Sequence, residues 1–366
     1  MTEPATHILF ADAISAAGNH CLQAEQTFFA GHQAFSVPEH FAAHALKHGL
    51  CSGLQPQPGE SRAVALFDRL AERLPHLPPD TAIFLATTVG AIDCLEQAQP
   101  TAMPDCPGIL LDTVKKRFPQ HQAILISAAC ASGQIATACA MRALRRNRCR
   151  TALVIGLDIT SEFVTSGFAS LGAVSRTITR PYDKHRDGLL LGEGAGALLL
   201  SQESSSSALG RLLATRESCD AAHITAPDLS GQQLSSLISA TLQEAGIMPA
   251  DIGGIIGHGT GTLYNDQSEI AALTKVFGCC TAGPPLVSIK GNIGHTLAAS
   301  GILQTVYGLT FLRRAQIPPQ AGLRSPALGA EPFVATAAQK MHSPYLLSLN
   351  VGFGGLNSAL LLEAQP

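Results

Sequence analysis

The sequence predicts an α/β protein made of two related halves, with a pair of buried helices packed between two sheets. Short apolar runs alternate with helical stretches along most of the 366 residues. Two helical stretches, residues 129–146 and 296–314, are rich in Ala, Gly, Ser and Thr, and both end in Leu-Arg-Arg. A Ser-rich segment, residues 201–210, separates the two series. The alternation predicts mostly parallel sheets covered on both faces, and the repetition predicts a duplicated unit.

The first half contains five apolar runs, which we interpret as buried parallel strands. These runs are residues 7–14, 81–89, 123–129, 151–159 and 195–202. Helices are predicted between them over residues 61–74, 108–118 and 129–146. The last of these helices follows its strand directly, so a tight strand-to-helix turn is expected at Cys130.

The second half repeats the pattern after the Ser-rich segment. Helices are predicted over residues 232–246, 267–278 and 296–314, with a strand and turn in each of residues 252–260 and 285–295. Residues 345–363 close the chain as two strands around a Gly-rich turn. Small residues let helices approach closely, so the two helices ending in Leu-Arg-Arg are expected to pack against each other. Their arginines would complement the helix dipole and reach water.

The composition limits the classes of protein that this chain can be. Apolar residues make up 46% and charged residues 14%, which indicates a large interior or a surface partly covered by another subunit. The net charge of −3 gives no reason to expect a nucleic-acid partner. No apolar run is long enough to cross a membrane, and the first residues lack the features of a signal peptide, so we expect a cytoplasmic protein. The 10 cysteines include no C-x-x-C pair, so neither a metal site nor a disulfide framework is expected.

Three residues have the sequence context of an active site. Cys130 lies where a strand runs into a helix, and the free N–H groups of a helix N-terminus stabilise a thiolate and lower its pKa. His258 and His295 both follow predicted strands in Gly-rich turns, and the second comes five residues after Lys290. Ligands bind beyond the carboxyl ends of parallel strands, where these side chains are expected to converge. The competing interpretations are a buried structural cysteine and two ordinary turn histidines.

Five motifs occur in an order that resembles the elongating β-ketoacyl-acyl carrier protein synthases, condensing enzymes of the thiolase superfamily. They are AACASG, RPYDKHRDGLLLGEGAGALLL, GHGTGTLYND, SIKGNIGHTLAASG and NVGFGGLNSALLLE. The resemblance implies a thiolase-like fold, with duplicated α/β halves forming a layered αβαβα core around two buried central helices. Residues 1–205 would form the half that carries the nucleophile. Residues 206–366 would form the half that carries the histidines and the Gly-rich loop.

The resemblance also implies a reaction, in which each residue has a role. Cys130 would accept an acyl group from the phosphopantetheine arm of an acyl carrier protein, with no other cofactor. His258 and His295 would donate hydrogen bonds to a malonyl thioester as it loses CO₂, and the carbanion would attack the acyl group. The backbone N–H groups of Cys130 and Phe353 would form the oxyanion hole, and Phe353 would gate the site. Two histidines are typical of the elongating branch.

The sequence departs from this family at three places. Where a glutamate is expected nine residues after the second histidine, the chain has Gln304. That glutamate would help to balance the buried Lys290, and a neutral amide cannot, so the network around the lysine must differ. Gly257 stands where alanine usually precedes the first histidine. The first 120 residues are also shorter than expected, in the region that shapes the acyl pocket and the dimer.

Two alternatives stay open at this point. The chain fits a specialised synthase of a polyketide or aryl-polyene pathway, paired with a second ketosynthase-like subunit in a heterodimer. It also fits a non-condensing partner such as a chain length factor, although that role needs none of Cys130, His258 and His295. A homodimer or heterodimer is expected in either case.

The five arginines of residues 141–150 either dock the carrier protein or form a solvated helix end, and we favour the second interpretation.

Overall fold

The computed structural model describes residues 5–41, 45–57, 59–97, 103–278 and 283–365. Its strands are β1 (Thr6–Ser15), β2 (Thr81–Ala86), β3 (Ala123–Ile126), β4 (Thr151–Asp158), β5 (Gly194–Ser201), β6 (Gly210–Cys219), β7 (Ile252–Ile256), β8 (Leu286–Val287), β9 (Gln316–Ile317), β10 (Gln339–Lys340), β11 (Tyr345–Gly352) and β12 (Leu356–Ala364). Its α-helices are α1 (Cys21–Phe29), α2 (Arg62–Ala71), α3 (Asp93–Gln97), α4 (Cys106–Arg117), α5 (Ser132–Arg145), α6 (Glu162–Ser170), α7 (Gln232–Ala245), α8 (Leu263–Phe277), α9 (Lys290–Ile293) and α10 (Ser300–Arg314).

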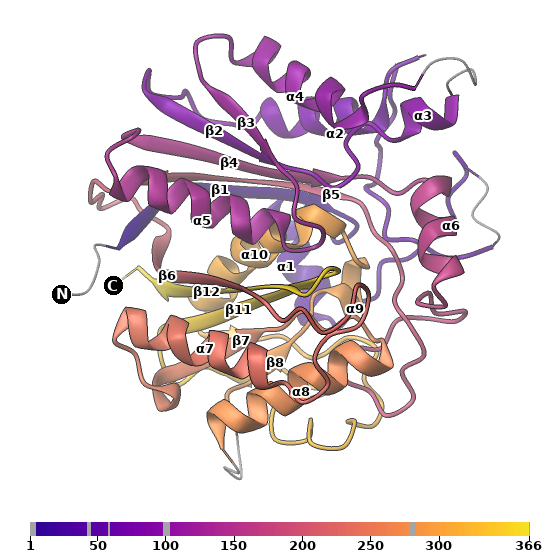
Figure 1. Cartoon of the computed structure of the whole chain (residues 1–366), viewed down its shortest axis with the longest axis vertical. Helices are drawn as coiled ribbons and strands as arrows, with labels where there is room; N and C mark the ends of the chain where they lie inside the picture. The colour runs from indigo at the N-terminus through magenta and orange to yellow at the C-terminus, as the bar shows by residue number, and fades with distance from the viewer. Residues whose placement is uncertain (1–4, 42–44, 58, 98–102, 279–282, 366) are drawn as a thin grey trace.

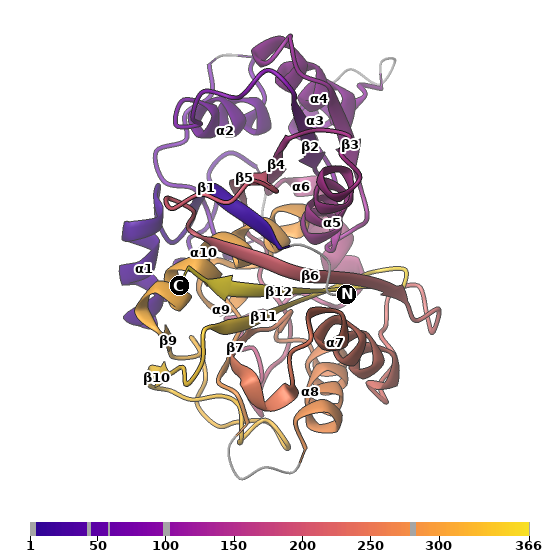
Figure 2. The same ribbon diagram turned by 90° about the vertical axis from the view of Figure 1, so that its left-hand side faces the viewer.

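The described elements form five layers, as the sequence predicts. Ten strands are hydrogen-bonded in the order β3-β2-β4-β5-β1-β6-β12-β11-β7-β8. The first five of this order lie on one side of α5 and α10, and the last five lie on the other side (Figures 1 and 2). Helices α2, α3 and α4 cover the outer face of the first group, and α7 and α8 cover that of the second (Figure 1). We call these groups the first and second half-sheets; β1 and β6 join them through only three residue pairs.

The prediction of mostly parallel sheets is wrong. In the described part of the chain, β2 runs parallel to β3 and β4, and β7 runs parallel to β8 and β11. The pairs β1–β5, β1–β6, β4–β5, β6–β12 and β11–β12 are antiparallel. An apolar run shows that a strand is buried, but it does not show from which end of the sheet the chain enters that strand.

Strand β3 is less buried than its apolar sequence predicts. It ends the strand order, and Ile124 in its middle is 50% exposed. A strand at the end of a sheet has a neighbour on one side only, so apolar residues need not be covered there within one chain. The exposed edge of β3 is therefore a surface that a partner subunit can cover.

The two central helices touch through glycines. A Cβ atom on Gly133 of α5 would lie 2.6 Å from the carbonyl oxygen of Ala298, and one on Gly301 of α10 would lie 2.6 Å from the backbone nitrogen of Gln134. Both distances are shorter than real Cβ contacts, so only glycine permits this separation. The predicted pair of small-residue helices is therefore confirmed.

Three further predictions from the sequence can be compared with the described residues. Three of the five arginines in residues 141–150 form ion pairs within this chain: Arg142 with Glu217, Arg145 with Glu244, and Arg150 with Asp80. The eight described cysteines are free thiols; Cys279, Cys280 and the first four residues of the chain lie outside the described residues. No helix in the described ranges is both long enough and apolar enough to cross a membrane.

Candidate active site

Cys130 occupies a sharp turn between β3 and α5. The turn contains Ala129 in the left-handed region, with φ of +48°. The hydroxyl of Ser132 accepts a hydrogen bond from the backbone N–H of Ala128 (2.8 Å) and donates one to the carbonyl of Ala129 (2.6 Å). Helix α5 begins at Ser132, so Cys130 precedes the helix by two residues instead of starting it. This turn holds the thiol at the inner end of a cavity.

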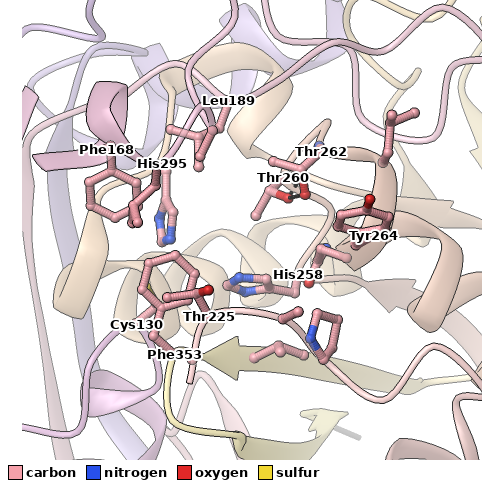
Figure 3. A pocket seen from close by; sticks show the side chains of 18 of the residues that line it. Cys130, Phe168, Leu189, Thr225, His258, Thr260, Thr262, Tyr264, His295 and Phe353 are labelled. Atoms are coloured by element: carbon pink, nitrogen blue, oxygen red, sulfur yellow. Dashed lines mark hydrogen bonds between the residues drawn. The ribbon is translucent and has the colours of Figure 1, made fainter. Parts of the chain in front are cut away.

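The cavity has a volume of about 400 Å³ and brings together the three residues predicted from the sequence. Cys130, His258 and His295 all line it, and Phe353 lies beside them (Figure 3). The centroids of the two imidazole rings are 5.4 Å apart, with the rings almost perpendicular at 86°. The cavity therefore places one thiol and two imidazoles within reach of a single substrate.

The turn that carries His258 is held by a buried carboxylate that the sequence did not single out. The carboxylate of Glu269, on α8, accepts hydrogen bonds from the backbone N–H groups of His258 (2.6 Å) and Gly259 (2.8 Å). It also accepts one from the hydroxyl of Tyr182 (2.8 Å). Asp266 ends the motif GHGTGTLYND and Glu269 follows three residues later, inside the helix predicted over residues 267–278, and that spacing was the available signal.

The local backbone determines the tautomer of His295. Its Nδ1 accepts a hydrogen bond from the backbone N–H of Leu297 (3.2 Å) and lies 3.2 Å from the hydroxyl of Ser300. A backbone N–H only donates, so Nδ1 of the neutral ring is bare and Nε2 carries the proton. Leu297 has φ of +48°, which keeps residues 295–299 out of regular α-helix. Helix α10 therefore starts at Ser300, later than the sequence predicts, and His295 lies in the preceding turn.

Burial controls the protonation of the basic groups. Desolvation lowers the pKa of His258 and of His295 well below the ordinary value of 6.5, and the nearby Lys290 lowers both further. Both rings are therefore neutral at neutral pH. Desolvation also lowers the pKa of Lys290 and raises that of Glu269, while Glu269 and Asp266 favour the charged form of the lysine. These two carboxylates of α8 supply the negative charge that Gln304 lacks.

The expectation of a lowered pKa for Cys130 is wrong. Burial raises the pKa of this thiol to about 12, although Lys290 and the backbone N–H groups of Cys130 and Phe353 favour the thiolate. Desolvation of the charged form outweighs these attractions in a site closed off from water. Cys130 is thus a thiol before substrate binds, and its proton needs an acceptor when the sulfur attacks. The same two N–H groups have the position expected of an oxyanion hole.

Gln304, which lies on α10, has no contact with Lys290 and is bound by uncharged groups. Its amide nitrogen donates to the carbonyls of Gly257 (2.9 Å) and Leu349 (3.2 Å). Its amide oxygen accepts a hydrogen bond from the side chain of Asn350, on β11. The carbonyl oxygen of Asn350 in turn faces Nδ1 of His258 at 3.3 Å.

Phe353 lies in the turn between β11 and β12 and stacks on a second phenylalanine. The rings of Phe353 and Phe168 are 5.7 Å apart and inclined by 26°, and the ring of Phe168 is 6.4 Å from that of His295. Phe353 is followed by Gly354 (φ +83°) and Gly355 (φ +75°), and such backbone angles favour glycine. Phe168 lies in none of the five motifs, so sequence reasoning missed it.

Comparison with known families identifies the chain. Residues 122–206 match the β-ketoacyl synthase N-terminal domain, and residues 209–324 match the β-ketoacyl synthase C-terminal domain. These two matches cover more than half of the chain. The protein belongs to the β-ketoacyl synthase family. The two matches meet in the Ser-rich segment that separates the two halves of the sequence.

Curated relatives of this chain include proteins named as polyketide beta-ketoacyl synthases and as 3-oxoacyl-[acyl-carrier-protein] synthases. The chain is 30% identical over 270 residues to a putative polyketide beta-ketoacyl synthase 1 of Streptomyces cyaneus, covering 70% of this chain and 64% of that protein. It is 31% identical over 253 residues to 3-oxoacyl-[acyl-carrier-protein] synthase 2 of Coxiella burnetii, covering 66% of this chain and 61% of that protein. The matched parts thus span less than two thirds of these relatives.

Solved structures match this β-ketoacyl synthase over its whole length. One is the ketosynthase ApeO in complex with its chain length factor ApeC from Xenorhabdus doucetiae, with a TM-score of 0.85, 26% identity, and 99% and 98% of the two chains covered. Another is the ishigamide ketosynthase/chain length factor, with a TM-score of 0.89, 25% identity, and 100% of both chains covered. The predicted thiolase-like fold is confirmed by these neighbours.

Proposed function

We propose that this chain is an acyltransferase of the 3-oxoacyl-acyl carrier protein synthase type, which joins an acyl thioester to malonyl-acyl carrier protein with loss of CO₂. The observation that supports this proposal most is the single cavity lined by Cys130, His258 and His295. Both rings are neutral, and two backbone N–H groups face the thiol. That combination suits a nucleophile with an oxyanion site on one side and two uncharged hydrogen-bond donors on the other.

The first half-reaction loads an acyl group onto Cys130. The sulfur attacks the carbonyl carbon of the acyl thioester, and the N–H groups of Cys130 and Phe353 stabilise the resulting oxyanion. The thiol proton is transferred to the departing phosphopantetheine sulfur, because Nε2 of both neutral imidazoles already carries a proton. An acyl-cysteine and a free carrier thiol result, so atoms and charge balance. The raised pKa of the thiol makes this proton transfer part of the reaction.

The second half-reaction extends the acyl group. His258 and His295 donate Nε2–H hydrogen bonds to the thioester oxygen of malonyl-acyl carrier protein, where negative charge develops as CO₂ leaves. The enolate carbon attacks the acyl-cysteine, the same N–H pair stabilises the second oxyanion, and the sulfur of Cys130 leaves and regains a proton. The product is a 3-oxoacyl thioester on the carrier protein. No step requires a metal or another cofactor besides the phosphopantetheine arm.

We also propose a partner subunit and a cytoplasmic location. The exposed edge of β3 ends only a few residues before Cys130, so a subunit covering that edge would lie next to the acyl group. The partner is a second copy or a ketosynthase-like subunit. Two solved neighbours are described as ketosynthases with chain length factors, which favours a polyketide or polyene synthase in a heterodimer. The complete set of Cys130, His258 and His295 favours a condensing subunit over a chain length factor. We retain residues 1–205 and 206–366 as its two halves.

The test is acyl transfer to the protein, measured by intact-protein mass spectrometry with acyl-acyl carrier protein as donor. The wild-type chain, alone and with its partner subunit, is expected to gain one acyl mass, and Cys130→Ala none. Cys139→Ala is the matched control, because Cys139 is a half-buried thiol on α5, the helix that follows Cys130. Equal acylation of Cys130→Ala and wild type would refute the assignment. So would acylation that is lost only in Cys139→Ala.

A further inference from the structure

We propose that Gln304 is a positioning residue that acts on His258 through Asn350. Gln304 orients Asn350 so that a hydrogen-bond acceptor lies beside Nδ1 of His258. The charge state of Lys290 then determines which nitrogen of the His258 ring carries the proton. The inference rests on the proposed function, because it concerns the donor role of His258 in decarboxylation.

The orientation of the Gln304 amide follows from its neighbours. Its nitrogen lies between two carbonyl oxygens, those of Gly257 at 2.9 Å and Leu349 at 3.2 Å. A carbonyl oxygen only accepts, so the NH₂ group of Gln304 must face both. The amide oxygen of Gln304 is therefore turned toward Asn350 and has no alternative orientation with comparable hydrogen bonding.

Asn350 transmits this orientation to the histidine. Its NH₂ group donates to the oxygen of Gln304, so its own oxygen faces Nδ1 of His258 at 3.3 Å. Turning the Asn350 side chain over would bring two acceptor oxygens together in a fully buried site, which is costly. A hydrogen-bond acceptor is thus fixed next to Nδ1 of His258.

Lys290 favours the unprotonated form of Nδ1, whereas Asn350 favours its protonated form. Its ammonium nitrogen lies 3.4 Å from Nδ1 of His258 and can only donate. While Lys290 is charged, Nδ1 accepts from it, and the ring proton stays on Nε2, the donor that decarboxylation needs. When Lys290 loses its proton, Nδ1 takes up the ring proton and donates to Asn350. Nε2 is then bare and repels a developing enolate oxygen.

The charged and titratable groups around this pair are few. Glu269 and Asp266 of α8 favour the charged form of Lys290, and Cys130 and His295 also lie close enough to interact with its charge. His295 does not respond to the lysine in the same way, because a backbone N–H occupies its Nδ1. A carboxylate at position 304 would be repelled by the two carbonyls that hold the amide, and it would favour the charged form of Lys290. The amide therefore leaves the charge of Lys290 dependent on the two carboxylates of α8.

The experiment follows both the tautomer and the rate with pH. Nitrogen-15 NMR of histidine-labelled protein reports which nitrogen of His258 is protonated, from about pH 6 to about pH 10, a range that includes the value of about 8 to which burial lowers the pKa of Lys290. Malonyl-acyl carrier protein decarboxylation is measured over the same range. In wild type, we expect the ring proton of His258 to move from Nε2 to Nδ1 over the same alkaline pH range in which the decarboxylation rate falls.

Two variants change this behaviour in a predicted direction. Gln304→Glu is expected to move the alkaline fall of the rate upward by about one pH unit, which is about tenfold more activity on that limb. Asn350→Leu removes the acceptor, so Nε2 is expected to keep its proton at every pH tested. Gln134→Glu is the matched control, because Gln134 is an equally buried amide on α5 that binds Ser348 instead of Asn350.

The outcomes separate this inference from the proposed function. A wild-type ring that keeps its proton on Nε2 throughout overturns the inference, and this titration needs no variant to fold. The inference is also overturned if the decarboxylation rate falls at the same alkaline pH in wild type, Gln304→Glu and Asn350→Leu. It is overturned as well if Gln134→Glu shifts the pH of this fall as much as Gln304→Glu does. Acyl loading of Cys130 is measured in the same samples. Its absence from wild type contradicts the proposed function, whereas loading with an unchanged alkaline fall contradicts only the role of Gln304.

Discussion

Adding one methyl group at Gly301 is expected to separate the two central helices. A Cβ atom there would lie 2.6 Å from the backbone nitrogen of Gln134, whereas ordinary contacts begin at 3.4 Å, so the helices must move apart by about 0.8 Å. A gap of that size loses a quarter to a half of the dispersion attraction of the atoms lining it. Overpacking of this kind costs about 1–3 kcal/mol, net of the small helix-propensity gain of alanine.

The assay for Gly301→Ala is urea unfolding followed by circular dichroism, with Gly308→Ala as the matched control. Gly308 lies on the same helix, but a Cβ there meets only side-chain carbons, of Leu362, Ile256 and Leu346, at 3.1–3.3 Å. Those side chains can shift slightly, so the control is expected to stay within about 1 kcal/mol of wild type. Equal unfolding free energies for the two variants would refute the close backbone packing of α5 against α10.

Three other predictions concern the site and the partner surface. His258→Ala and His295→Ala should each lose about 10²-fold or more in malonyl decarboxylation, measured as CO₂ release, and an unchanged rate in either would remove that residue from the donor pair. Alkylation of Cys130 by iodoacetamide should rise about tenfold per pH unit above neutrality, because burial raises the pKa of the thiol and only the thiolate reacts; a plateau near neutral pH would contradict this. Ile124→Asp should convert a dimer into monomers in light scattering, because an interface of about 2,000 Å² or more cannot bury an unpaired charge on β3; an unchanged mass would place the interface elsewhere.

Local patterns in the sequence correctly predicted the layers and the convergence of Cys130, His258 and His295 at one cavity. The small residues of α5 and α10 predicted a close helix pair, and Gly133 and Gly301 form that contact. Cys130 and His258 come shortly after β3 and β7, His295 follows β8 and the short helix α9, and all three line one cavity as expected. These predictions succeeded because each depends on residues that are close together in the chain.

The predictions that failed depend on distant parts of the chain. Strand direction is determined by where each connection enters the sheet, which a run of apolar residues does not reveal. The pKa of Cys130 follows from burial by the surrounding segments, so the helix terminus alone was a poor guide. Asn350 begins one of the five motifs and Phe168 lies in none of them, but each acquires its role from a residue far along the chain: His258 for the first and Phe353 for the second.

Strands β1 and β6 pair over only a short length, so the active site forms only when the two half-sheets are packed together. Cys130 belongs to the segment of the first half-sheet, whereas both histidines and Lys290 belong to that of the second. Three residue pairs join the two groups of strands, and the other attachments include the packing of α5 against α10 and the hydrogen bond from Ala298 to Asp158. A chain cut in the loop between β5 and β6 would therefore regain its cavity only when the fragments reassociate. The accessibility of the Cys130 thiol would report that reassociation directly.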